Sequence, residues 1–140
     1  MTDFETERAD GYQEDLPLDK KTWQSFWKSV IPEYELARCR AELRGDTAPA
    51  RHLFLREKFV RYAHNLNLDK CKKYHQKMME FELQEMENPS DNKVTIIRRG
   101  WDPEDTVTAE DEYAVIQLSN MFKRHYDTRV RLLELIPFVS

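Results

Sequence analysis

Residues 38–77 contain the side chains that are best suited to bind an anionic partner. Eleven lysines and arginines stand against four acids, so this segment carries +7 and the rest of the chain −11. Aromatic residues alternate with the cations, a mixture that suits phosphate contact together with base stacking. The acidic remainder can equally neutralise the segment internally. The cations that we predict to bind a partner are Arg56, Lys58, Arg61, Lys72 and Lys73.

A metal site is a second possibility in the same segment. Cys71 and His75 lie four residues apart and so share one helical face, and His64 with Cys39 could complete a Cys2His2 zinc site. Structural zinc sites usually have closely spaced ligands at both ends, whereas Cys39 has no close second ligand. A core cysteine beside a surface histidine is the simpler interpretation. We therefore predict no cofactor and no metal, and keep metal binding through Cys71 and His75 as an alternative.

Patterns typical of enzymes are weak. The four histidines lack metalloprotease spacing, no serine lies in a nucleophile elbow, and three glycines leave no phosphate-binding loop. His125 is predicted to be an exposed residue of a long helix. A solvated acidic helix end, rather than a di-metal cluster, is predicted for four glutamates: Glu80, Glu82, Glu85 and Glu87. We predict that the chain is not an enzyme.

The composition favours a helical fold. A chain of 140 residues can bury one core without disulfides, and three glycines supply few of the tight turns that a many-stranded sheet needs. We predict a mostly α fold, a small bundle of four to five helices that forms a single domain over residues 19–140. Residues 1–18 hold six acids and one arginine, so they are predicted to form an acidic, flexible tail.

Apolar spacing locates the N-terminal helices. Asp19 can cap a first helix in which Trp23 and Trp27 are core anchors. Pro32 is predicted to end or kink this helix, because proline lacks the backbone donor that a helix interior needs. A second helix should then end at Gly45, a residue suited to a left-handed cap. Its predicted buried stripe is Leu36, Cys39 and Leu43.

Three more helices are predicted downstream. Two of them, beginning near Thr47 and Asp69 and joined by a short turn, should form an antiparallel hairpin. The C-terminal helix has the clearest period, and its length predicts that part of its apolar stripe is exposed to a partner or to a second copy. That stripe consists of Val115, Leu118, Phe122, Tyr126, Val130 and Leu133.

Residues 93–99 are the one β-prone stretch. They could form an exposed arm, a short hairpin with the segment around Trp101, or an edge that adds to another protein's sheet. Residues 102–112 are predicted to be an acidic connector. Ile96, Ile97 and Trp101 are therefore further candidates for partner binding.

These observations lead to one preferred function. The N-terminus lacks the pattern of a signal peptide and no apolar run is long enough to span a bilayer, so we expect a soluble intracellular protein, cytoplasmic or nuclear. We predict a non-enzymatic protein-binding subunit or adaptor that acts through helical surfaces on another protein or by self-association. A nucleic-acid-binding accessory protein that uses residues 38–77 is the alternative. Sequences of this kind are common among accessory proteins of viruses and phages.

Overall fold

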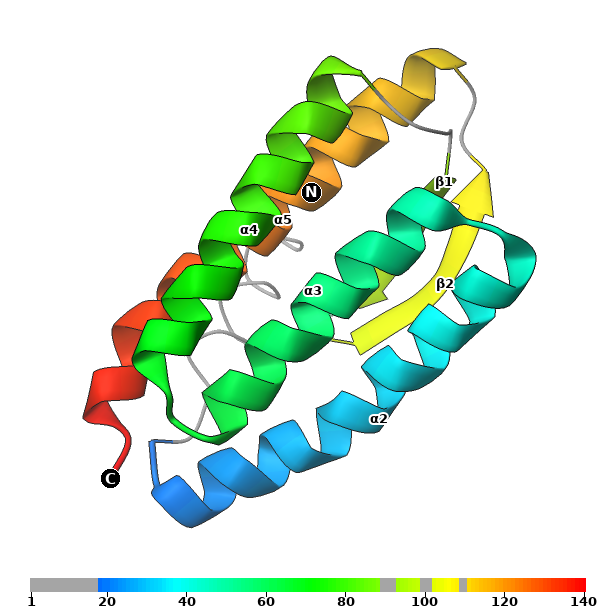
Figure 1. Cartoon of the computed structure of the whole chain (residues 1–140). Helices are drawn as coiled ribbons and strands as arrows, with labels where there is room; N and C mark the ends of the chain where they lie inside the picture. Colours follow the sequence, from blue (N-terminus) through cyan, green and yellow to red (C-terminus); the bar gives the residue numbers. More distant parts are fainter. Residues whose placement is uncertain (1–17, 89–92, 99–101, 109–110) are drawn as a thin grey trace, which may run out of the picture.

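The computed structural model describes residues 18–88, 93–98, 102–108 and 111–140; within the strands, and at most positions before Ser119 in the last helix, it describes the backbone alone. Figure 1 shows the elements. They are α2 (Lys20–Arg44), α3 (Thr47–His64), α4 (Leu68–Glu87), β1 (Lys93–Arg98), β2 (Asp102–Thr108), α5 (Asp111–Leu135) and a 3-10 helix (Ile136–Phe138). The prediction of a small, mostly helical bundle is confirmed. The predicted tail lies outside the described residues, Leu18 excepted.

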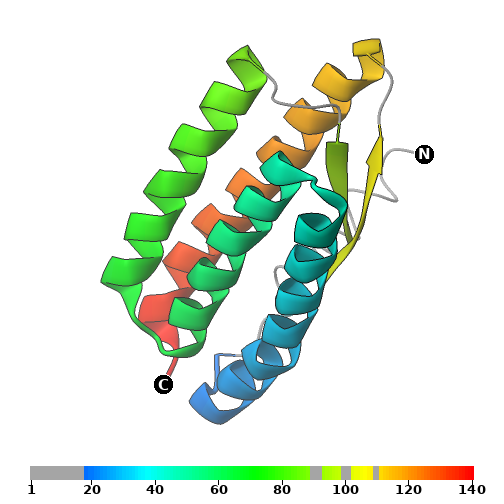
Figure 2. The same cartoon turned by 45° about the vertical axis from the view of Figure 1, so that its right-hand side comes forward.

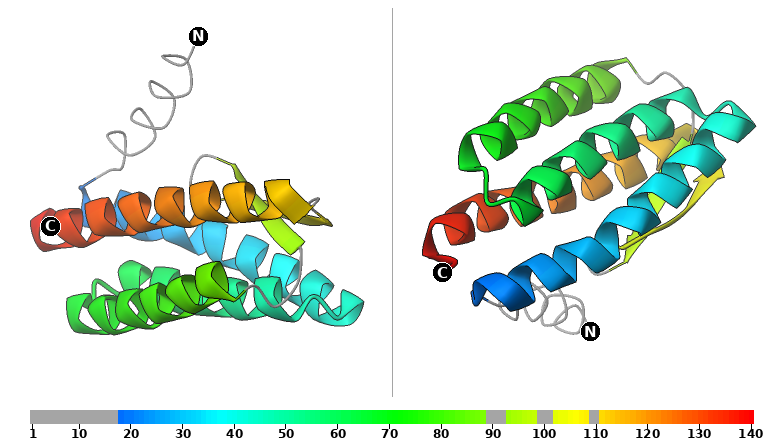
Figure 3. Two further views of the ribbon diagram at one scale, coloured as in Figure 1. Left: turned by 90° about the horizontal axis from the view of Figure 1, so that it is seen from above. Right: turned by 60° about the horizontal axis from the view of Figure 1, so that its bottom comes forward.

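Helices α2, α3 and α4 lie side by side in an antiparallel row, and α5 with the β hairpin covers one side of that row (Figures 1 and 2). Figure 3 shows the two layers from above. Because α3 lies in the middle of the row and against the second layer, it is buried around most of its circumference. The predicted antiparallel hairpin of the third and fourth segments is α3 with α4, and it is confirmed.

Helix α2 continues through Pro32, so of the two predicted outcomes, an end or a kink, the end is wrong, and the two helices predicted on either side of Pro32 are one helix. Pro32 lies on the exposed side of α2. The opposite side carries an unbroken apolar stripe at helical spacing: Trp23, Trp27, Val30, Tyr34, Ala37 and Ala41 are all buried. Burial of this stripe outweighs the hydrogen bond that proline removes. The predicted stripe of Leu36, Cys39 and Leu43 is the wrong face, since Leu36 is 48% and Leu43 88% exposed.

Side-chain and glycine caps define the helix ends. The Asp19 carboxylate accepts hydrogen bonds from the backbone N–H and the hydroxyl of Thr22, at 3.0 and 2.8 Å. Gly45 ends α2 in the left-handed conformation, with φ of 77°, as the sequence predicts. Asn67 caps α4 by accepting from the backbone N–H of Lys70. The caps at Gly45 and Asn67 lie in the two turns that connect the row of three helices.

Two tryptophans anchor the apolar core, as predicted. Trp23 and Trp27 are fully buried and meet edge to face, with ring centroids 5.6 Å apart. The indole N–H of Trp23 donates to the carbonyl of Ala63 at 2.8 Å and so ties α2 to the end of α3. Phe59 and Met78 are fully buried in the same core.

Strands β1 and β2 pair in an antiparallel hairpin, with an irregularity between Thr95 and Ile97. Of the three alternatives for residues 93–99, the structure shows the hairpin. The prediction that residues 102–112 form a connector is wrong over 102–108, because β-prone Val107 and its neighbours supply the partner strand that the backbone of β1 requires. The side chains of Ile96 and Ile97 are not described, and Trp101 lies outside the described residues.

The buried face of α5 differs from the predicted stripe. The residues buried on the described part of this helix are Phe122, His125, Thr128, Arg129 and Leu132. Of the predicted stripe, Phe122 is buried, Val130 and Leu133 are half-buried, and Tyr126 is 41% exposed; the side chains of Val115 and Leu118 are not described. Hydrophobicity was a poor guide here because α5 enters the core through polar side chains. Self-association through this helix stays a prediction.

Candidate functional site

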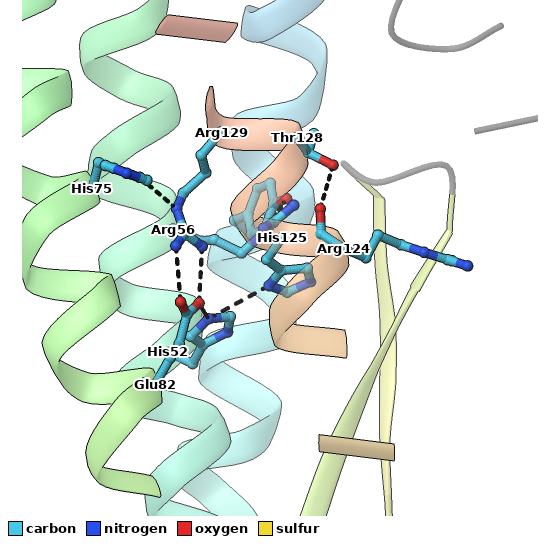
Figure 4. Close-up of polar contacts among 9 residues, drawn as sticks. His52, Arg56, His75, Glu82, Arg124, His125, Thr128 and Arg129 are labelled. Carbon is cyan, nitrogen blue, oxygen red and sulfur yellow. Dashed lines mark hydrogen bonds and ion pairs between the residues drawn. The ribbon is translucent and has the colours of Figure 1, made fainter. Parts of the chain in front are cut away.

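A cluster of buried polar side chains lies where α3, α4 and α5 meet (Figure 4). Helix α3 contributes His52 and Arg56, α4 contributes Glu82, and α5 contributes His125 and Arg129. Each of the five is at most 4% exposed. Solvent therefore does not reach them, and their charges and donors must be satisfied inside the protein.

Glu82 is the centre of the cluster. Both of its carboxylate oxygens accept from the Arg129 guanidinium, each at 2.8 Å, which is a bidentate pair. His52 Nε2 lies 2.8 Å from Glu82 Oε2. Arg129 is held in turn by His75, whose Nδ1 accepts from its Nε at 3.1 Å. The Glu82 carboxylate therefore accepts from three donors, and both of its oxygens are hydrogen-bonded.

The two buried histidines are packed ring against ring. His52 and His125 have centroids 4.8 Å apart and planes 12° apart, and His125 Nδ1 lies 3.4 Å from His52 Nε2. Because an ionised carboxylate can only accept, His52 Nε2 must carry the proton directed at Glu82. His125 Nδ1 then faces an N–H, which places the proton of a neutral His125 on Nε2. Among the described residues, neither His52 Nδ1 nor His125 Nε2 has a hydrogen-bond partner.

Burial and the two guanidiniums set the charges of this cluster. Burial lowers the pKa of His52, and Arg56 and Arg129 lower it further, although the hydrogen bond to Glu82 opposes them. Burial likewise lowers the pKa of His125, with Arg56, His52 and Arg129 acting in the same direction. Burial alone would raise the pKa of Glu82, but the hydrogen bonds from His52 and Arg129 lower it to about 2. Both histidines are thus neutral and Glu82 is ionised at pH 7.

Two sequence-based predictions fail at this cluster. His125 is buried instead of exposed, and Glu82 and Glu85 are buried instead of forming a solvated helix end; Glu80 and Glu87 are exposed as predicted. The available signal was spacing. His125 and Arg129 lie between Phe122 and Leu132 at the 3-4 spacing of one helix face of α5. This spacing predicts the buried face only if polar residues are counted as possible members of it.

A metal ion is a poor fit to this cluster. One atom each from His52, Glu82 and His125 lies within 4.8 Å of the others, and two imidazoles with a carboxylate can bind zinc or iron. The Glu82 carboxylate, however, is already neutralised by Arg129, and Arg56 acts on the same histidines. A divalent cation would add two positive charges where no further negative charge is supplied by these five residues.

We therefore expect the purified protein to bind no structural zinc. Protein prepared without a histidine tag and dialysed against zinc should retain less than about 0.2 equivalents, because a structural site fills close to stoichiometrically. Elemental analysis provides the measurement. Stoichiometric zinc that is lost in a His125→Phe variant would contradict this assignment and identify the three residues as ligands.

Cys71 and His75, the pair considered as metal ligands in the sequence, have other contacts. The Cys71 thiol donates to the carbonyl of Phe59 at 3.6 Å, and burial raises its pKa to about 12. A metal-binding cysteine needs the thiolate, which this environment disfavours. His75 accepts from Arg129, as described above. The structure therefore supports the interpretation of Cys71 as a core residue.

The second candidate site is an exposed basic surface on the α3–α4 hairpin. Arg51, Phe54, Lys58 and Tyr62 follow helical spacing along α3. On α4, Lys70, Lys73, Tyr74 and Lys77 follow the same spacing, and the stacked rings of Tyr62 and Tyr74, with centroids 5.7 Å apart, join the two series. We call these eight residues the basic face.

The cations of the basic face lie over its aromatic rings. Phe54 has Arg51 and Lys58 at 5.6 and 5.5 Å from its centroid, and Tyr74 has Lys77 at 5.3 Å. Cation–π contacts of this kind fix an ammonium group without neutralising it. Within the described part of the chain, none of the five cations of the basic face forms an ion pair with an acid.

The predicted cations divide into four groups. Lys58 and Lys73 lie on the basic face, and Lys72 is exposed on α4 outside its series. Arg61 is ion-paired with Glu35 and Glu57, at 3.2 and 2.9 Å, so acids of the chain do neutralise part of the basic segment. The prediction that Arg56 binds a partner at the surface is wrong, because Arg56 is 1% exposed and donates to the Tyr34 hydroxyl at 2.8 Å.

Comparison with known proteins gives no independent guide to the site. The chain matches no protein-family model, and no curated protein or solved structure is significantly similar to it. Among the described helices, none combines the length and the hydropathy required to cross a membrane. The function must therefore be inferred from the two sites themselves.

Proposed function

We propose that this chain is a non-enzymatic adaptor that binds an acidic segment of another protein on the basic face. The observation that carries the proposal is the set of five cations, Arg51, Lys58, Lys70, Lys73 and Lys77, which lie on one exposed surface without acidic partners among the described residues. Elsewhere in the same segment, Arg38, Arg44 and Arg61 are each paired with an acid. Unpaired like charges repel one another, and an acidic partner would relieve that repulsion.

The state of the aromatic rings favours an acidic protein segment over a nucleic acid. Phe54, Tyr62 and Tyr74 are half-buried, and cations of the protein already lie over each of them. Base stacking requires a free ring face. The whole chain also carries −4, which weakens its attraction to a polyanion at long range.

The non-enzymatic part of the proposal is supported by the location of the titratable groups. His52, Glu82 and His125 are the side chains with catalytic chemistry that meet in the described structure, and each is at most 4% exposed. A substrate cannot contact groups that are closed off in this way. The cations of the basic face are suited to docking an acidic segment, because complementary charges steer such a partner onto the surface.

Reversing three charges on the basic face should weaken partner binding strongly. A Lys58→Glu, Lys73→Glu, Lys77→Glu variant is expected to bind a labelled poly-glutamate peptide at least about tenfold more weakly than the wild type, since each close charge pair contributes to affinity. Fluorescence anisotropy at low salt measures the affinity. The fold of the variant should be intact, because none of the three lysines is buried.

A matched control separates the basic face from net charge. Lys21→Glu, Lys28→Glu, Lys123→Glu changes the charge of the protein by the same amount at exposed positions on α2 and α5, and should bind the peptide almost as well as the wild type. Equal losses in both variants would show that only net charge matters. Tight binding of labelled DNA or RNA but not of the peptide would support the nucleic-acid alternative instead, and binding of neither would end the proposal.

A further inference from the structure

The stacked His52 and His125 rings place two neutral imidazoles in a region where any added proton is strongly disfavoured. The charged and titratable side chains around them, among the described residues, come from three helices. They are Arg56 on α3, His75 and Glu82 on α4, and Arg124 and Arg129 on α5. Glu82 is the one acid of this set, and Arg129 already holds both of its oxygens.

We infer that the His52–His125 pair is an acid-sensitive latch that holds α5 against the row of helices at neutral pH and releases it when a proton binds. The inference is independent of partner binding on the basic face. His125 is the more sensitive member of the pair. His52 donates to Glu82, which would partly compensate a charge on its ring, whereas no acid contacts His125 in the described structure.

Proton linkage gives the direction of the effect. In the docked state the pKa of His125 lies well below its usual value, and in a released, hydrated helix it returns to about 6.5. Above that pH neither state binds the proton and docking is at full strength. As the pH falls below about 6.5, the released state binds the proton before the docked state does. For each proton bound only in the released state, the equilibrium constant for release rises about tenfold per pH unit.

The release should be confined to α5 because the two layers are held differently. The row of α2, α3 and α4 is held by a continuous apolar core that includes Trp23, Trp27 and Phe59, and the C-terminal part of α5 joins this core through Leu132. In the described part of α5, the buried side chains are the polar His125, Thr128 and Arg129 together with the apolar Phe122 and Leu132. Acid weakens the polar part of that contact and leaves the apolar core of the row unchanged.

Hydrogen exchange detected by mass spectrometry tests the latch on the full chain. Between about pH 7 and about pH 5, after correction for intrinsic exchange, the protection of α5 amides should fall about 30-fold for one proton taken up below pH 6.5. Amides of α2 should remain protected over the same range. Constant protection of α5, or equal loss of protection in α2 and α5, would overturn the inference.

Two variants assign the effect to His125. In His125→Phe, or in His125→Gln if the first does not fold, the pH dependence of α5 protection should decrease by about one proton, because neither side chain titrates in this range. His64→Gln is the matched control, since His64 is half-buried at the end of α3 outside the cluster, and it should retain the wild-type dependence. An unchanged dependence in the His125 variant would refute the assignment.

Discussion

Replacing Glu82 by leucine should lower the free energy of unfolding by about 3–5 kcal/mol, the usual cost of leaving a buried charge without its partner. The substitution removes the acceptor of both Arg129 nitrogens and of His52 Nε2, three donors that are closed off from water. Urea denaturation followed by circular dichroism measures the change. For a domain of this size such a loss is a large fraction of the total stability.

Two controls test the origin of that loss. The double variant Glu82→Leu, Arg129→Met should be more stable than Glu82→Leu alone, because it removes the unpaired guanidinium together with its partner. Glu134→Ala removes the acid from the exposed pair with Arg131, whose atoms are 3.9 Å apart, and should change stability by less than about 1 kcal/mol. If Glu82→Leu also proved neutral, the Arg129–Glu82 pair would not be buried as described.

Replacing Trp23 by alanine should also lower the free energy of unfolding by about 3–5 kcal/mol. The ring is fully buried between α2 and α3, and its loss leaves a cavity against Trp27 and removes the hydrogen bond to Ala63. Thermal denaturation followed by circular dichroism would record the change as a lower Tm.

Variants of graded severity show which part of the tryptophan matters. Trp23→Phe keeps most of the buried ring and loses the indole donor, so its cost should lie well below that of Trp23→Ala. Phe138→Ala removes an aromatic ring that is 70% exposed and should shift stability by no more than about 0.5 kcal/mol. A comparable loss from Phe138→Ala would mean that this exposed ring is covered, for example by a second copy.

The sequence predicted those elements whose hydrophobic pattern agrees with their burial. The Trp23 and Trp27 anchors, the Asp19 and Gly45 caps and the α3–α4 hairpin all follow from local rules that the structure obeys. The prediction at Pro32 was wrong because the apolar stripe buried on both sides of this proline stabilises the helix by more than the lost hydrogen bond costs. The β2 strand was missed because its acidic residues resemble a connector, and pairing is a non-local property.

The buried cluster could not be predicted in the same way. Hydropathy places His52, Glu82 and Arg129 at the surface, and their burial depends on three helices that bring complementary charges together from distant parts of the chain. For the basic face, the sequence predicted the segment that contains it but not which cations of that segment are unpaired at the surface. The i,i+4 spacing of Glu57 and Arg61 on α3 indicates one ion pair, whereas the second pair of Arg61, with Glu35, depends on how α2 packs beside α3.

The order of the helices also bears on how the chain reaches its fold. Helices α2, α3 and α4 follow one another through two short turns, so little loop entropy opposes the formation of their row, whereas α5 arrives only after the hairpin. We expect the row to be formed in the transition state for folding and α5 to dock after it. Loss of Trp23 should then slow folding, and loss of Glu82 should mainly accelerate unfolding. The unfolding rate, and with it the lifetime of the folded chain, would then depend mainly on the buried polar cluster, the part of the core that hydropathy does not predict.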